Sequence, residues 1–454
     1  MKRERLDQVL NEISDKHITE AATRKKRVRL TWIGSVAAAL AVVILGLAVL
    51  RPFAAAKAVT VSQADYPKYE WVSRHDQMAD TMPLLEDFFA ESMVLTLSGS
   101  TGNQTYSPVN LYMALCLMAE VSNSNDQILE LLNAQDREAL RQQANLIWNA
   151  TYLDDGNQTL LANSVWLDAG LDYNNDVMDT LAEHYYTDVY QGDLQSGKIG
   201  EEIKNWLNSH TGNLLKSDVD NLQVDPMTIM LLYSTVYYQA KWGSGFDSAR
   251  NTEGAFHAPG GDVDCTYMNK KHLQTNYYWA EDFGAVSLSL KDGSRMWLML
   301  PDEDKTTDHV LASQAFADMI FSPNYLDQEN SKYMLVNLTI PKFDIRASGD
   351  LKEDLQAMGI TDVFSPETAD FSGTLYGHKD FGDNFAPYVS AVNQATRVCI
   401  DEEGVTAASY IELPMAGAAA PPEEIIDFIL DRPFVFVITN RYDAPLFAGV
   451  VNEP

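Results

Sequence analysis

The C-terminal stretch of the chain, residues 400–454, reads IDEEGVTAASYIELPMAGAAAPPEEIIDFILDRPFVFVITNRYDAPLFAGVVNEP. Its two last apolar runs, Phe434–Ile438 and Leu446–Val451, are rich in β-branched and aromatic residues, which favour strands. Between Gly404 and Met415 every second residue is small or apolar, as in a strand that buries one face. These patterns predict a chain that ends in strands and carries, ahead of them, a segment able to become another strand.

The rest of the chain divides into a helical and a strand-rich part. Apolar residues spaced three and four apart predict helices over Leu84–Leu97, Leu111–Val121, Gln127–Leu132 and Ile203–Leu207. Strand patterns come later, at Met296–Pro301 and at Tyr333–Ile340. Helices in the first half and strands in the second predict an α+β domain built on mainly antiparallel sheets.

Composition excludes several classes of function. The 454 residues are 46% apolar, enough for a large core, and their formal net charge of -31 argues against sequence-independent binding to nucleic acid. Cys116, Cys265 and Cys399 lie far apart without a CxxC pair, so neither a disulfide framework nor a zinc ribbon is predicted. The sequence contains no GxSxG, GxxxxGK[ST] or HExxH motif and no GxGxxG after a strand. We expect neither an enzyme nor a bound cofactor or metal.

One apolar stretch near the N-terminus, LTWIGSVAAALAVVILGLAVL at residues 30–50, has the length of a helix that crosses a bilayer. Residues 24–29 include five Arg and Lys, and only Arg51 and Lys57 follow, so residues 1–29 are predicted to be cytoplasmic. The alternative is a signal peptide cleaved near residues 54–56, which would release a secreted form. We predict a cytoplasmic leader (1–29), a transmembrane helix (30–50), a juxtamembrane tether (51–79) and a globular domain (80–454).

Short motifs follow one another in a fixed order over residues 80–454. They are Tyr106-Ser107-Pro108, Asn163-Ser164-Val165-Trp166-Leu167, Tyr237-Tyr238-Gln239-Ala240-Lys241-Trp242, Pro341-Lys342-Phe343, Ala369-Asp370-Phe371-Ser372-Gly373, Glu402-Glu403-Gly404, Arg432-Pro433-Phe434 and the final Leu446–Pro454. In this order they resemble the serpin family of serine protease inhibitors, and with the apolar stretch 30–50 the chain resembles a bacterial, membrane-anchored member. The resemblance implies the serpin fold, with large mainly antiparallel sheets, a helical N-terminal half and an exposed reactive loop, here preceded by one transmembrane helix.

The resemblance also implies a mechanism, in which a target protease cuts the loop and the cut loop inserts as a new strand of the main sheet. The loop hinge is then formed by Glu402, Glu403, Gly404, Val405, Thr406, Ala407 and Ala408. About ten new backbone hydrogen bonds and several buried aliphatic side chains give insertion a drive on the order of 10–20 kcal/mol.

Two loop residues depart from the pattern of inhibitory members. Val405 stands where Thr or Ser is usual, and Pro414 would forfeit one ladder hydrogen bond in a central strand. They leave open a non-inhibitory serpin that acts as a binding or signalling ectodomain.

Two further groups of residues follow from the resemblance. A polar cluster beneath the point where the sheet opens, called the shutter cluster, is predicted at Ser107, Asn110, Ser234 and Asn393. Trp242 matches the breach, the top of the sheet where the hinge enters. Since a buried polar group without a partner costs about 1–3 kcal/mol, we expect the shutter residues to hydrogen-bond to one another. The simpler interpretations, solvated polar residues and a core aromatic, stay open.

The resemblance also implies a scissile bond at Ala418–Ala419, within about two residues, because members of the family keep a similar spacing between the hinge glycine and the cleaved bond. Residues 415–420 contain no Arg or Lys, which argues against trypsin-like targets. The expected partner is therefore an elastase-like or subtilisin-like serine protease. We expect a monomer that binds no nucleic acid and sits in the membrane through one N-terminal helix, with its C-terminal domain outside the cell.

Overall fold

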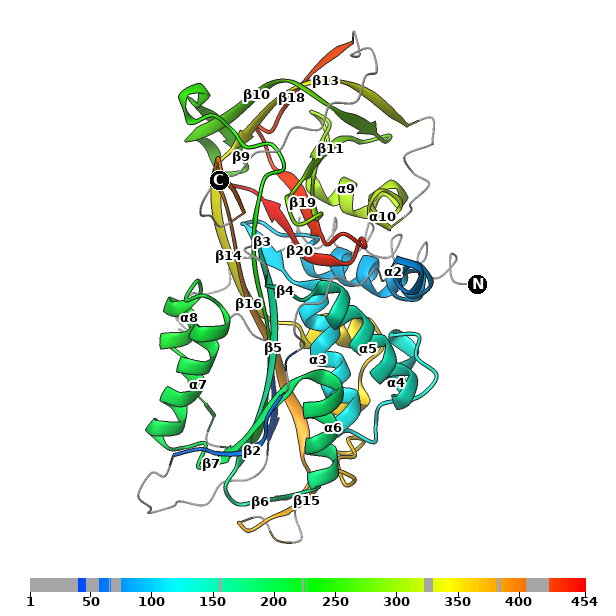
Figure 1. Ribbon diagram of the computed structural model, residues 1–454, viewed down its shortest axis with the longest axis vertical. Helices are drawn as coiled ribbons and strands as arrows, with labels where there is room; N and C mark the ends of the chain where they lie inside the picture. Colours follow the sequence, from blue (N-terminus) through cyan, green and yellow to red (C-terminus); the bar gives the residue numbers. More distant parts are fainter. Residues whose placement is uncertain are drawn as a thin grey trace.

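The computed structural model describes residues 40–45, 57–64, 66, 75–154, 157–222, 224–225, 227–321, 330–380, 382, 385–405 and 424–454. Within them, helices from the first half of the chain pack against two large sheets (Figure 1). The predicted α+β class is therefore confirmed.

The first sheet, called the main sheet, contains the long strands β5 (Gln158–Asp168), β8 (Thr228–Lys241) and β16 (Tyr388–Ile400). Its order is β14 (Phe343–Asp350), β16, β8, β5, β7 (Thr187–Gly192) and β2 (Val59–Ser62), with β4 (Leu153–Asp154) beside β5. Two short strands, β17 (Gly404–Val405) and β1 (Leu40–Leu45), lie between β16 and β8. Neighbouring strands are antiparallel apart from β5 and β7, which are parallel.

The second sheet contains the C-terminal strands. Its order is β18 (Ile425–Ile429), β13 (Ser331–Pro341), β10 (Gly261–Trp279), β11 (Phe283–Ser289), β12 (Arg295–Pro301), β19 (Phe434–Thr439), β20 (Pro445–Val451) and β3 (Gln104–Tyr106), with β9 (Thr252–Ala258) beside β10. A separate pair joins β6 (Leu171–Tyr173) to β15 (Leu375–His378). The strands predicted at Met296–Pro301, Tyr333–Ile340, Phe434–Ile438 and Leu446–Val451 all lie in this sheet, and the prediction is confirmed for each.

The helices are α2 (His75–Leu97), α3 (Pro108–Val121), α4 (Asp126–Leu131), α5 (Arg137–Thr151), α6 (Asn175–Tyr185), α7 (Gly197–His210), α8 (Lys216–Asp220), α9 (Thr307–Ala312), α10 (Gln314–Phe321) and α11 (Lys352–Ala357). All four predicted helical segments lie within or overlap α2, α3, α4 and α7. Ser107 caps α3 through its hydroxyl, and Pro108 takes the first helical position, where its missing N–H costs nothing.

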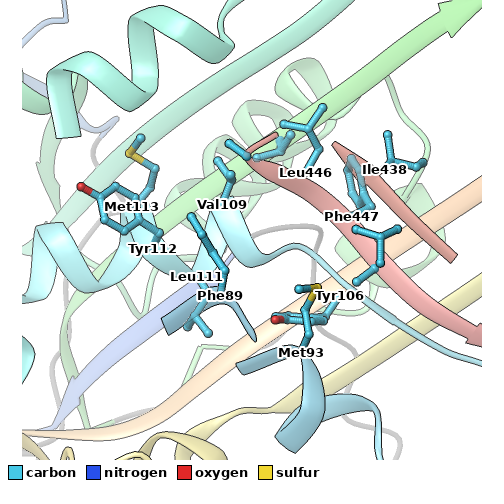
Figure 2. Packing of buried hydrophobic residues seen from close by; sticks show 14 of the residues in the cluster. Phe89, Met93, Tyr106, Val109, Leu111, Tyr112, Met113, Ile438, Leu446 and Phe447 are labelled. Atoms are coloured by element: carbon cyan, nitrogen blue, oxygen red, sulfur yellow. The ribbon is translucent and has the colours of Figure 1, made fainter. Parts of the chain in front are cut away.

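The main sheet is covered on both faces. On one face Ile199, Ile203 and Trp206 of α7 pack with alternate residues of β5 and β8 such as Trp166 and Tyr233. On the other face lies α3, whose residues are all buried. Figure 2 shows Val109, Leu111 and other α3 side chains beside Leu446 and Phe447 of the second sheet. Helix α3 therefore forms the centre of the core between the two sheets.

The N-terminal part differs from the sequence prediction in two places. Within the predicted tether, β2 forms an edge strand on β7, and Ala64 donates its amide hydrogen to Asp188 at 3.1 Å. Within the predicted transmembrane stretch, Leu40–Leu45 form strand β1, and the rest of residues 30–50 lies outside the described residues. The β-branched residues of β1 favour a strand where two neighbouring strands offer backbone groups. No helix among the described residues is long and apolar enough to cross a membrane.

Candidate functional site

The candidate site is the gap in the main sheet between β8 and β16, called the slot. At its top β17 pairs with both flanking strands, with Val405 opposite Ala240 on β8 and Ile400 on β16. Lower down β1 also pairs with both strands. Between β17 and β1, residues 235–239 of β8 face a part of the slot in which the structure describes no strand. A cavity of about 30 Å³ lies there, lined by residues that include Val236, Tyr238, Gln394, Thr396 and Val405.

Trp242 binds the hinge backbone at the breach. Its indole Nε1 donates to the carbonyl oxygen of Asp401 at 2.8 Å, and its own amide donates to the carbonyl oxygen of Glu403 at 3.0 Å. The buried ring meets Phe246 edge to face at 5.9 Å, and the amide of Phe246 donates to the carbonyl oxygen of Glu402 at 2.9 Å. Trp242 thus holds the hinge directly, in addition to filling the core.

Gly404 is where the hinge enters the sheet. A Cβ at this position would overlap the carbonyl oxygen of Ala240 and lie 2.7 Å from the Cα of Lys241, both backbone atoms of β8. The carboxylate of Asp401 accepts hydrogen bonds from the amides of Glu403 at 2.8 Å and Gly404 at 3.2 Å. A tight turn closed by Asp401 therefore delivers a residue that must be glycine to the top of the slot.

Glu402 fastens the hinge to the second sheet. Its carboxylate lies 2.6 Å from the ammonium of Lys342 and accepts a hydrogen bond from the amide of Asn251. Partial burial acts to raise the pKa of Glu402, but the Lys342 and Asn251 hydrogen bonds outweigh it and hold that pKa below its usual value. Glu402 is therefore a charged clamp of the hinge, while the neighbouring Glu403 is exposed.

The shutter cluster lies beneath the slot on the α3 face of the sheet. Ser107 donates its hydroxyl hydrogen to the carbonyl oxygen of Leu446 at 2.6 Å and accepts from the amide of Asn110 at 3.3 Å. Gln394 of β16 accepts from the amide of Ser107 at 2.9 Å and donates to the Ser107 carbonyl at 3.1 Å and the Asn110 side chain at 3.3 Å. All three residues are buried, so this network ties β16 to the start of α3.

The amide that joins Ser107 and Asn110 belongs to Gln394, and not to the predicted Asn393. The buried residues Val392, Gln394, Thr396, Val398 and Ile400 alternate along β16, whereas Asn393 is half-buried and out of phase with them. This alternation is visible in the sequence and would have identified Gln394, because successive strand residues face opposite sides of a sheet.

Ser234 is buried on β8, where its backbone lies opposite Asn163 of β5 and Leu40 of β1. Asn163 donates its side-chain amide to the carbonyl oxygen of Tyr185 at 2.9 Å. The structure therefore brings Ser107 and Asn110 into one hydrogen-bonded group and places Ser234 on the neighbouring strand of the slot.

The remaining predicted site residues lie outside the described residues. They are Thr406, Ala407 and Ala408 of the hinge, the departure Pro414, and the predicted scissile pair Ala418 and Ala419. Their roles stay predictions. Within the described part of the chain, no group of three or more His, Cys, Asp or Glu side chains is arranged to hold a metal ion.

Comparison with known proteins places this geometry in a family. The profile of the family described as Serpin (serine protease inhibitor) matches residues 86–454. Serpin-ZX of Arabidopsis thaliana is 26% identical over 381 residues, which cover 80% of this chain and 94% of the relative. Plasminogen activator inhibitor 1 of Neovison vison is 27% identical over 373 residues, which cover 78% and 87%. The native structure of the thermophilic serpin tengpin superposes with a TM-score of 0.71 at 21% identity, covering 88% of this chain and 100% of tengpin.

The chain belongs to the serpin family, because the family profile covers residues 86–454, which are most of the chain. Members of this family are in general protease inhibitors and not catalysts.

Proposed function

We propose that this chain inhibits serine proteases by offering its loop as a substrate and inserting the cut loop into the slot. The observation that carries the proposal is β17, in which Gly404 and Val405 already pair as the first residues of a strand between β8 and β16. Val405 is only 3% exposed, so an apolar residue is accepted at the position where inhibitory members usually carry Thr or Ser. Insertion would extend a strand that has already begun.

The drive for insertion comes from backbone pairing and apolar burial. Continuing β17 past Val405 would add about ten ladder hydrogen bonds at roughly 1 kcal/mol each, and several buried aliphatic side chains would add further stability. In the register of β17, Pro414 would lie opposite Leu231 of β8 and lose one of these bonds. This loss is small against a total on the order of 10–20 kcal/mol.

The proposed target follows from the residues at the predicted scissile bond. Ala418 and Ala419, with only small or apolar neighbours, fit a shallow pocket in the protease and not one that binds a basic side chain. We therefore propose an elastase-like or subtilisin-like target, met outside the cytoplasm by a chain of the bacterial, membrane-anchored type.

The test is incubation of the full chain, in lipid-free buffer and reconstituted into phosphatidylcholine vesicles, with pancreatic elastase, subtilisin and trypsin, followed by boiling in detergent and electrophoresis. A complex that survives boiling is expected with elastase or subtilisin and not with trypsin. Cleavage of the loop by all three enzymes without any such complex, in buffer and in vesicles alike, would refute the inhibitory function.

The second candidate is a non-inhibitory serpin that serves as a binding or signalling ectodomain. Pro414 favours it, and so does β1, which lies in the lower part of the slot where the cut loop would have to end. For such a protein the same incubation would give a cut chain and free, active protease.

A further inference from the structure

Strand β1 lies where the inserted loop would lie. It runs antiparallel to β8 and to β16, in the same direction as β17. Ala41 lies opposite Tyr233 on β8 and opposite Asn393 on β16. Both flanking strands are therefore bridged by a segment from the far N-terminal part of the chain.

The register shows which loop residues β1 would displace. Val405 pairs with Ala240, so the residue seven positions later, Glu412, would pair with Tyr233, the partner of Ala41. On the other side Val405 pairs with Ile400, so Glu412 would pair with Asn393, again the partner of Ala41. The two independent registers agree over Ala41–Val43, which take the positions of residues 412–414, and the register with β8 extends the match to Leu40–Ile44 and residues 411–415.

At these positions of the slot, residues 40–44 are better suited to form a strand than loop residues 411–415. Val43 takes the position of Pro414 and supplies the backbone N–H that proline lacks. Ala41 takes the position of the charged Glu412. The run LAVVIL is also rich in β-branched residues, which favour strands. Both features that weaken the loop in the lower half of the slot are absent from β1.

The chain is long enough to hold β1 and β2 in place together. One row of backbone partners crosses the main sheet from β1 to β2. It runs through Ile44 of β1, Met230 of β8, Leu167 of β5, Gln191 of β7 and Val59 of β2. Four strand spacings separate the ends of this row, about 19 Å. The residues that connect β1 to β2 could span roughly 45 Å if extended, which exceeds this distance.

Residues 40–45 also belong to the apolar stretch 30–50 that is long enough to span a bilayer. Backbone inside a bilayer must form its hydrogen bonds within a helix, whereas β1 forms them with β8 and β16. The same residues cannot do both at once. Membrane insertion of the stretch and occupation of the slot therefore exclude each other.

We propose that residues 40–45 are an internal ligand of the lower slot that blocks full insertion of the reactive loop, and that a lipid bilayer empties the slot by taking up the same residues. The effect of this exchange on protease inhibition rests on the proposed function. The chain would then trap proteases when it is anchored in a membrane and be restrained when it is not.

A disulfide between β1 and β16 tests whether β1 occupies the slot, and its formation can be measured without any inhibition assay. In a full-length Cys265→Ser, Cys399→Ser background, Ala41→Cys and Asn393→Cys are introduced together, because directly opposed antiparallel residues lie within disulfide range. The matched control pairs Glu412→Cys with Asn393→Cys. In lipid-free buffer the 41–393 disulfide is expected to form and the 412–393 disulfide is not. Formation of 412–393 without 41–393, or of neither, would overturn the proposal.

The membrane arm repeats the experiment with the chain reconstituted into phosphatidylcholine vesicles. The 41–393 disulfide is expected to disappear, and its persistence at the lipid-free level would contradict release by the bilayer. Val43→Pro removes the ladder hydrogen bond of β1 and is expected to speed formation of the elastase complex in lipid-free buffer roughly fivefold or more. If the 41–393 disulfide forms but no variant traps a protease, the proposed function fails while the slot assignment stands.

Discussion

Gln394 gives the sharpest test of the shutter cluster. Gln394→Leu keeps a similar volume but removes the acceptor of the Ser107 amide and the donor to the Asn110 side chain, two buried groups. The Ser107 carbonyl keeps its bond from the amide of Leu111 at 3.1 Å, so it is not orphaned. Each buried group without a partner costs about 1–3 kcal/mol. A water in the adjoining cavity of about 30 Å³ would relieve one of them, so we expect a loss of about 1–3 kcal/mol from the other.

The matched control is Asn393→Leu, one residue earlier on the same strand. Asn393 is half-buried, and no hydrogen bond of its side chain is found among the described residues. Its replacement should change stability by no more than about 0.5 kcal/mol. Urea unfolding of both full-length variants, followed by tryptophan fluorescence, measures the difference. Equal losses, or a larger loss for Asn393→Leu, would refute the assignment of Gln394 as the residue that joins β16 to α3.

Four further predictions concern the hinge and the loop. Gly404→Ala adds a Cβ that overlaps β8, so the amide of Val405 should exchange its hydrogen faster than in the wild type, and an unchanged exchange rate would contradict the close approach. Glu402 has a lowered pKa, so its contribution to stability is present above its unfolded pKa of about 4.3 and is lost as the pH falls through the folded value. Wild type should therefore lose more stability than Glu402→Gln between pH 6 and pH 3, and parallel curves in urea unfolding would show that the clamp is not ionic. Ala407→Arg should turn the inhibitor into a substrate that is cut by elastase without a detergent-stable complex, and undiminished inhibition would exclude insertion at this hinge. In the Val43→Pro variant, which should free the slot of β1, cutting the loop between residues 417 and 420 should raise the unfolding midpoint by roughly 10 °C or more in a thermal melt, whereas an unchanged midpoint would favour the non-inhibitory candidate.

Local patterns in the sequence were sufficient for the α+β class. The apolar spacing of Leu111–Val121 predicted the helix that became the buried α3, and the C-terminal runs predicted β19 and β20. These features depend on residues close together in the chain, and short-range patterns report such features well. Gly404 was assigned to the hinge by the family resemblance and not by a local pattern, and the structure shows that a Cβ there would overlap backbone atoms of β8.

The partners across the site were decided by tertiary structure. The Glu402 clamp brings together Lys342, Asn251 and Glu402, which lie far apart in the sequence, and no local pattern joins them. The shutter amide was placed at Asn393 by motif order, although the alternation of β16 selects Gln394. Hydrogen-bond partners depend on which strands become neighbours, and that is settled by packing over long sequence separations.

The apolar stretch 30–50 shows most clearly what the sequence alone cannot predict. Its composition alone determined that these residues avoid water, and by length it predicted a membrane helix. Only the tertiary structure revealed a second place for Leu40–Leu45, a slot between β8 and β16 where the backbone of both flanking strands pairs with β1. Hydropathy measures the free energy of leaving water and carries no information about the destination, because a bilayer and an open sheet both accept apolar residues. The destination depends on whether a partner surface exists, and here that surface is built by β8 and β16, which begin only at Thr228 and Tyr388.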